Sequence, residues 1–263
     1  MAETNVAMSR FSNLEFSGDA EERSASVPIL KDELYYQQEA QTAYESGDFE
    51  QALRSYAKVL EYNPQNPAAW AGQVKMLIEL GEFREGKLWA DKALEQFPHE
   101  PELLAAKAVA LARLGDIHDA MAFSDAAIEE RGDTPYIWLA RGDVLLAAKQ
   151  KQAVSCVEQA LVRARDWFVH WLASRIYYYY GKFSLALKMA RAGVALDAGH
   201  SCLWLQLGYC QMALGLASVA VNSFQEALQL NPQCREAAAA SARLSRAGPV
   251  RRLFRACRGV FRS

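Results

Sequence analysis

Few side chains in this 263-residue chain have the types and spacing that catalysis or metal binding requires. The four histidines, which suit proton transfer near neutral pH, lie far apart in the sequence at positions 99, 118, 170 and 200. No two have the close spacing of a metal pair, and no Cys-x-x-Cys motif occurs. A glycine-rich phosphate loop, a Gly-x-Ser-x-Gly turn and a His-Glu-x-x-His motif are also absent. We therefore predict no catalytic residue, no cofactor and no metal, and expect the function to reside in surfaces.

Composition and targeting signals narrow the class of protein further. The five cysteines are an odd number without the close pairing of a disulfide framework, which favours a reducing, cytoplasmic location. The N-terminus lacks a basic segment followed by an apolar one, and no apolar run approaches the roughly 18–20 residues that span a bilayer. The net charge of -2 gives no global field that would attract nucleic acid, so we expect no nucleic-acid partner.

The two ends of the chain differ in charge. Residues 1–33 carry seven acids and three bases, whereas residues 243–263 carry seven arginines and no acid. In the C-terminal sequence PVRRLFRACRGVFRS, apolar residues recur at the spacing of one helical stripe, and arginines fill the rest of the circumference. This pattern is typical of an amphipathic helix that contacts an anionic membrane surface or a partner. The predicted contact residues are Arg251, Arg252, Leu253, Phe254, Arg255, Arg258 and Phe261. Two alternatives stay open: the stripe docks on the last helix, or the tail is disordered.

The dominant signal along the chain is an internal repeat. The stretch GDFEQALRSYAKVLEYNP at residues 47–64 is followed 34 residues later by GEFREGKLWADKALEQFP. Small residues mark corresponding points in six copies, at Ala52, Gly86, Ala120, Ala153, Ala186 and Ala220. Their separations of 34, 34, 33, 33 and 34 residues indicate stacked supersecondary units.

Each repeat unit has the pattern of two helices. In the first copy, apolar periodicity runs from about Leu34 to Tyr44, and Gly47 then ends the helix. Asp48 is placed to cap a second helix, which the prolines in NPQNP at residues 63–67 terminate. The small residues let the two helices approach closely.

These residues resemble the tetratricopeptide repeat family over about residues 34–232. WLQLG at 204–208 matches the family's Trp-x-x-Leu-Gly, while Ala220, Phe224 and Pro232 match its Ala-x-x-x-Phe and closing Pro. Trp70 and Trp138 repeat the Trp. The fourth copy departs from the pattern, since it loses one residue at its inner turn, AAKQKQA, and another near Asp166. The resemblance implies an all-α solenoid of about six helix-turn-helix repeats that form a right-handed superhelix with a concave face.

The resemblance also implies a ligand groove lined by one face of each unit's first helix. The groove residues carried over are Tyr44, Lys75, Arg113, Tyr136, Leu139, Asp143, Phe168, Trp171, Arg175, Tyr178 and Tyr209. Aromatic area with an isolated arginine is typical of a binding hot spot. The alternative is that several of these aromatic residues pack in the core. The cationic clamp with which some family members hold a carboxylate is absent here, because its places hold Gln37, Gln41, Gly72, Glu102 and Ala106.

The sequence therefore favours a non-catalytic adaptor or scaffold that binds a peptide or helix of a client protein in its groove. An alternative is a peripheral membrane assembly factor held by the basic tail, which would make the chain membrane-associated. A third is the regulatory subunit of an enzyme. The predicted segments are a flexible, acidic and Ser-rich stretch at 1–30, six repeats at 31–232, a capping helix at 233–247 and the tail at 248–263.

Overall fold

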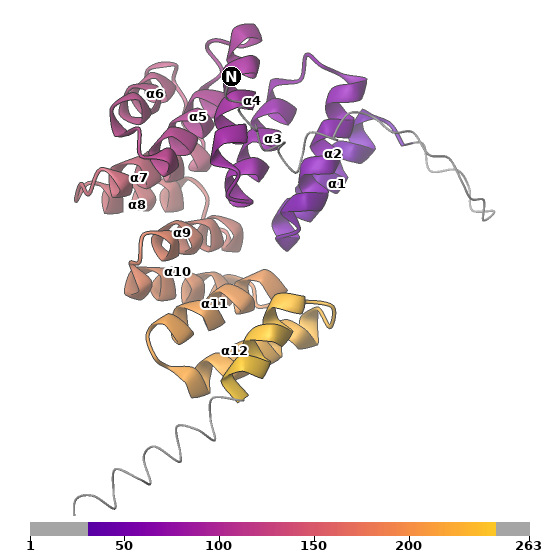
Figure 1. Ribbon diagram of the computed structural model, residues 1–263, viewed down its shortest axis with the longest axis vertical. Coiled ribbons are helices and arrows are strands. Elements are labelled where there is room, and N and C mark those ends of the chain that lie inside the picture. Colours follow the sequence, from indigo (N-terminus) through magenta and orange to yellow (C-terminus); the bar gives the residue numbers. More distant parts are fainter. Residues whose placement is uncertain (1–30, 246–263) are drawn as a thin grey trace, which may run out of the picture. The chain divides into compact units, whose positions relative to one another are not determined.

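The computed structural model describes residues 31–245, and all regular secondary structure in that range is helical. Successive helices lie side by side in chain order (Figure 1). The helices with defined bounds are α1 (Glu33–Ser46), α2 (Phe49–Tyr62), α3 (Pro67–Glu79), α4 (Phe83–Gln96), α5 (Pro101–Leu114), α6 (Ile117–Glu129), α7 (Pro135–Ala147), α8 (Ala153–Arg163), α9 (Trp167–Tyr179), α10 (Phe183–Leu196), α11 (Ser201–Ala213) and α12 (Ala217–Leu230). The predicted all-α class is confirmed over the described residues, while the handedness of the superhelix stays a prediction.

Left-handed glycines join the two helices of most pairs. Gly47, Gly81, Gly115, Gly181 and Gly215 all have φ values between 67° and 92°. After α1, the N–H of Gly47 donates to the carbonyl of Tyr44 at 3.1 Å, and the N–H of Asp48 donates to that of Ala43 at 2.9 Å. These two bonds form a Schellman motif, in which a residue without a Cβ takes the left-handed position at no steric cost. The recurring glycine therefore ends the first helix of these five pairs.

The second half of each turn starts the next helix. The Asp48 carboxylate accepts a hydrogen bond from the N–H of Gln51 at 3.0 Å, so the cap predicted for the second helix is confirmed. Pro67, Pro101 and Pro135 occupy the first turns of α3, α5 and α7, where a missing N–H costs nothing. Turn and cap chemistry thus agree with the repeat pattern.

The recurring tryptophan ties the start of a helix to the loop before it. In α3 and α11, the indole N–H groups of Trp70 and Trp204 donate to a carbonyl oxygen six residues earlier, at 2.9 and 2.8 Å. In α9 this position holds His170, whose Nδ1 lies 2.7 Å from the carbonyl oxygen of Asp166. The histidine therefore contacts the N-cap of its own helix, four residues earlier, instead of the loop carbonyl that the tryptophans reach.

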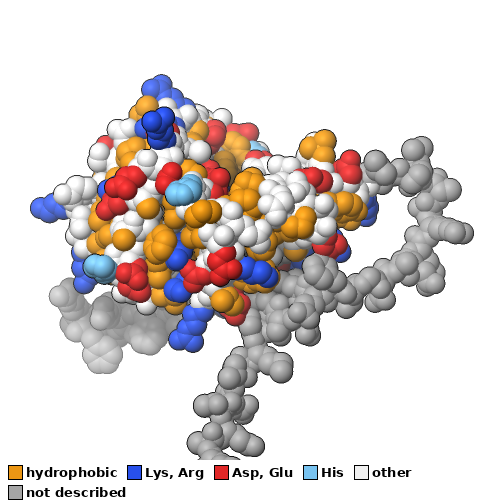
Figure 2. Space-filling view, turned by 90° about the horizontal axis from the view of Figure 1, so that it is seen from above, with side chains coloured by type: hydrophobic (Ala, Val, Ile, Leu, Met, Phe, Trp, Pro, Cys, Tyr) orange, Lys and Arg blue, Asp and Glu red, His pale blue; other side chains and the backbone are white. Residues whose placement is uncertain are grey.

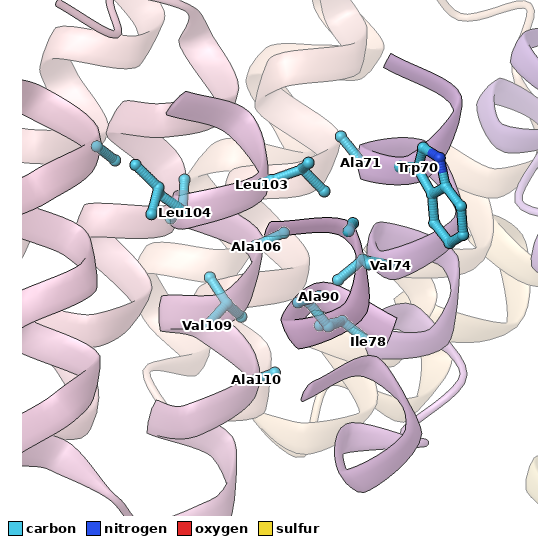
Figure 3. Packing of buried hydrophobic residues seen from close by; sticks show 14 of the residues in the cluster. Trp70, Ala71, Val74, Ile78, Ala90, Leu103, Leu104, Ala106, Val109 and Ala110 are labelled. Carbon is cyan, nitrogen blue, oxygen red and sulfur yellow. The ribbon is translucent and has the colours of Figure 1, made fainter. Parts of the chain in front are cut away.

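Small residues set the spacing between helices. A Cβ placed on Gly208 would lie 2.5 Å from the ring of Phe224, so only glycine fits between α11 and that ring. The repeat-marking alanines Ala52, Ala120, Ala153, Ala186 and Ala220 are all buried. Figure 3 shows Ala90, Ala106 and Ala110 among larger side chains such as Leu103 and Val109. These contacts give the close helix packing that the sequence predicts.

Residues 235–245 form a further helical stretch after α12. Its Ala237 and Ala240 are buried in one cluster with Phe224 and Ala227 of α12. The predicted segments 1–30 and 248–263, and with them every predicted tail contact, lie outside the described residues. The proposed segment boundaries therefore stay predictions.

The fourth helix pair departs from the pattern at its inner turn, as its sequence does. Lys149 takes the left-handed conformation there, with a φ of 57°, at the position where the other described turns have glycine. Its N–H and that of Gln150 make the same pair of bonds, at 3.0 and 2.8 Å, to Leu146 and Leu145. The turn keeps its Schellman geometry despite a side chain that disfavours it.

We predict that Lys149→Gly raises the free energy of unfolding by about 0.5–1 kcal/mol, because it relieves left-handed strain at the cost of some unfolded-state entropy. The melting temperature should rise by about 1–4 °C. Gly115→Lys is the matched control, since a Cβ there meets no atom within 4 Å and only the φ of 92° opposes it. That variant should melt lower. A lower melting temperature for Lys149→Gly would contradict the account of the turn.

Candidate functional site

The structure divides the predicted groove residues into two sets. Tyr44, Leu139, Asp143 and Trp171 are buried, with Trp171 only 2% exposed. The partly exposed residues are Lys75, Arg113, Tyr136, Phe168, Arg175, Tyr178 and Tyr209. For the buried set, the structure agrees with the core alternative that the sequence left open, because these side chains offer almost no surface to a client.

Trp171 is buried because the first and fifth helix pairs touch across the inner face, which is the face that carries the predicted groove residues. The ring of Phe49, the first residue of α2, stacks on Trp171 of α9 with centroids 5.9 Å apart. Beside it, Tyr44 of α1 meets Phe168 of α9 edge to face at 4.9 Å. Aromatic pairs at these separations are attractive beyond the area they bury. Residues more than 100 positions apart thus share one cluster.

Arg175 completes this contact between distant repeats. Its Nε and Nη2 donate to Glu79 Oε2 of α3 at 2.9 and 2.6 Å. The guanidinium also lies over the rings of Phe49 and Trp171, at 4.6 and 5.2 Å from their centroids. The planar guanidinium of arginine can bond a carboxylate and stack on aromatic rings at the same time, which the ammonium group of lysine cannot do. Arg175 is therefore engaged within the chain.

Arg113 is also neutralised internally. It forms an ion pair with the buried Asp143, with Nε 3.0 Å from Oδ1, and its Cζ lies 3.4 Å from the ring centroid of Tyr179. The Tyr180 hydroxyl donates to the same carboxylate at 2.6 Å. Burial, and then the charge of Asp143, raise the pKa of Tyr180 well above its usual value, so the hydroxyl stays a donor. Asp143 thus has its charge compensated without a ligand.

Lys75, the remaining cation among the predicted groove residues, is paired too. Its Nζ lies 2.5 Å from Glu102 Oε2 and 4.0 Å from the ring centroid of Tyr136. Thr134 donates to the other oxygen of Glu102 at 2.8 Å. Burial opposes ionisation of Glu102, but the charge of Lys75 keeps its pKa below the usual value. This cluster holds helices together rather than presenting a charge.

A cavity of about 540 Å³ remains open beside the Arg175–Glu79 pair. We call it the aromatic pocket. Its aromatic residues are Phe83, Tyr178, Tyr179, Phe183 and Tyr209, and its charged residues are Glu79, Arg113 and Arg175. Tyr179 is 48% exposed. Because each of these charges already has a partner, the pocket presents mainly aromatic surface.

A second cavity of about 650 Å³ is also lined by the two residues of this ion pair. We call it the acidic pocket. It is bounded by the first inner turn, residues 46–50, and by residues 231–236 after α12. Both cavities are lined by Glu79, Arg175, Gln206 and Tyr209. The Arg175–Glu79 pair therefore borders both cavities.

Sequence reasoning missed three aromatic residues that help to form the site. Phe49, Phe83 and Phe183 are the first residues of α2, α4 and α10, and each contacts α9 or its end. The signal was present, since each follows a turn glycine in a Gly-x-Phe triplet. The corresponding helices α6 and α12 begin with Ile117 and Ala217 instead.

The described residues offer little for chemistry. Between residues 31 and 245, no three His, Cys, Asp or Glu side chains gather closely enough to hold a metal ion. Cys156, Cys202 and Cys210 are buried, and burial raises the pKa of the Cys202 thiol to about 12. That thiol stays protonated near neutral pH and is a poor nucleophile. The arrangement is suited to binding.

Comparison with known proteins now decides the family. Sequence models described as tetratricopeptide repeat match residues 43–108 and 203–234. The chain contains tetratricopeptide repeats. No curated protein sequence matches it.

Solved structures share the tetratricopeptide fold at low sequence identity. A tetratricopeptide repeat protein from Parabacteroides merdae is 15% identical with a TM-score of 0.53, over 83% of this chain and 86% of that one. The human IFIT1 dimer with m7Gppp-AAAA is 19% identical with a TM-score of 0.52, over 90% and 60%. The APC/C hetero-tetramer Cut9–Hcn1 is 15% identical with a TM-score of 0.50, over 82% and 44%. The chain thus spans about half the length of the Cut9 and IFIT1 structures that it matches. The likeness shows the fold alone.

Two features of this tetratricopeptide repeat chain bear on partners. On the face in Figure 2, acidic and basic side chains are interspersed, with hydrophobic ones between them. In the part of the chain that the structure describes, no helix combines the length and the apolar character that crossing a bilayer requires.

We predict that Arg175 and Glu79 couple energetically by about 1–2 kcal/mol in a double-mutant cycle of alanine variants, because the pair is partly buried and stacked. The measurement is denaturant unfolding of the two single variants and the double variant. The control cycle is Lys58 and Glu61, an exposed pair one turn apart at 2.8 Å, which should couple by about 0.5 kcal/mol or less. Equal coupling in the two cycles would show that the contact between distant repeats adds nothing.

Proposed function

We propose that the aromatic pocket binds an apolar segment of a partner protein, so that the chain acts as an adaptor. Tetratricopeptide repeat proteins generally mediate protein–protein interaction, and their fold is typically a non-enzymatic scaffold. The observation that carries the proposal is a cavity of about 540 Å³ with five aromatic residues in its lining. Its size is ordinary for a ligand site.

The chemistry of the pocket favours apolar anchors over charged ones. Arg113 and Arg175 are already bound to Asp143 and Glu79, so an acidic ligand would have to compete with an internal carboxylate. Exposed aromatic area, in contrast, is desolvated at little cost when an aliphatic or aromatic side chain covers it. Among the residues that line the pocket, Tyr179 is the large hydrophobic residue that is exposed.

Four residues carried over from the family groove line this pocket, namely Arg113, Arg175, Tyr178 and Tyr209. We propose that Tyr178 and Tyr209 contact the client directly, with Tyr179 and Phe83 completing the surface. Arg175 would act by holding the wall of the pocket. Trp171 would support the site from the interior, where its ring stacks on that of Phe49.

We predict that panning the immobilised full chain with a phage-displayed library of random dodecapeptides enriches peptides with aromatic or large aliphatic residues. Tyr179→Ala and Tyr209→Ala should weaken the selected peptides about tenfold or more, which corresponds to about 1.4 kcal/mol. Tyr62→Ala is the matched control, because Tyr62 is 55% exposed and does not line the pocket. It should change the affinity less than twofold.

The proposal fails if the selected peptides bind the two pocket variants and the control variant equally, while circular dichroism shows that all three are folded. It also fails if selection enriches acidic C-termini instead, because the pocket would then be recognising charge.

A further inference from the structure

The acidic pocket combines apolar walls with carboxylates. Its apolar and aromatic lining residues are Phe49, Leu80, Trp171, Leu205 and Tyr209. Its charged lining residues are Asp48, Glu50, Glu79 and Glu236, against Arg175 and Arg235. A ligand that fits must therefore offer apolar side chains together with cations.

Most of the carboxylates in this pocket are accessible. Asp48, Glu50 and Glu236 are exposed, and only Glu79 is held in a partly buried ion pair. Glu50 lies 3.6 Å from Arg54, with both side chains about 60% exposed, which makes a weak pair that a better-placed cation could replace. Arginine suits such a site, since its guanidinium bonds carboxylates in a fork and stacks on aromatic rings.

From this geometry we infer that the acidic pocket binds residues 251–263 of the same chain. This segment carries five arginines and no acid, so its charge complements the pocket. It also offers large apolar residues, Leu253, Phe254 and Phe261, to the aromatic walls. The inference concerns a different cavity from the one proposed for a client and does not depend on that proposal.

The place where the described chain ends makes this contact reachable. Residues 231–236 line the pocket, and the helical stretch at 235–245 then leads directly toward the segment. Eleven helical residues rise about 16 Å. The same distance is covered by about five extended residues, so residues 246–250 are long enough to return to the pocket. A short tether also gives a high effective concentration, on the order of millimolar, for the intramolecular contact.

The test is hydrogen–deuterium exchange of the full chain, read by mass spectrometry on the backbone amides of residues 251–261. We expect these amides to exchange at least about tenfold more slowly than in the synthetic peptide 249–263, because docking protects them. Glu50→Lys with Glu236→Lys should abolish the protection. Glu95→Lys with Glu129→Lys is the matched control, with the same charge change at two exposed positions, and should retain it.

A second variant, Phe254→Glu, keeps the test decisive if the charge reversal disturbs folding, because it alters none of the residues that line the pocket. It should also remove the protection. Protection that appears only on addition of phosphatidylserine vesicles would overturn the inference in favour of a membrane. Protection that survives Glu50→Lys with Glu236→Lys would place the segment elsewhere, and protection that rises with protein concentration would assign it to a second copy.

Discussion

The ion pair between Arg175 and Glu79 joins side chains that are 96 residues apart in the sequence. In a simple repeat array each unit contacts only its neighbours, and stability is a sum of local terms. Here Phe49, Trp171 and Arg175 form an additional contact between the first, second and fifth helix pairs. The inner face is therefore a packed interface over part of its area, and this contact determines which parts of that face stay open.

The position of the contact between distant helix pairs determines which cavities stay open. The same two charged side chains line the aromatic pocket and the acidic pocket, so neither cavity is independent of the other. The first presents aromatic surface with its charges already satisfied, whereas the second retains exposed carboxylates. A partner segment and a basic segment can thus be recognised by different chemistry on one scaffold. No catalytic group is required for either role.

The sequence predicts the helices well because their causes are local. The recurring glycine, the Asp48 cap and the helix-starting prolines act within a few residues. Because similar signals recur about every 34 residues, each unit supports the helix assignment of the next. The departure at Lys149, which replaces the turn glycine, was also visible in the sequence, because the fourth copy loses one residue at its inner turn. Local chemistry could not show that Trp171 is buried, because its neighbours come from a repeat much earlier in the chain. The distance between non-adjacent repeats depends on the small rotations between all the neighbouring helices that separate them. No short sequence motif encodes the accumulated rotation.

The central claim is that aromatic side chains of distant repeats touch across the inner face. The most direct test is nuclear Overhauser spectroscopy of the full chain with selectively labelled Phe and Trp. Cross-peaks are predicted between the rings of Phe49 and Trp171, whose centroids are 5.9 Å apart. Tyr209 and Phe224, at 5.5 Å within one helix pair, provide the internal standard once Tyr is labelled too. A spectrum with the standard peaks but none between Phe49 and Trp171 would contradict the account.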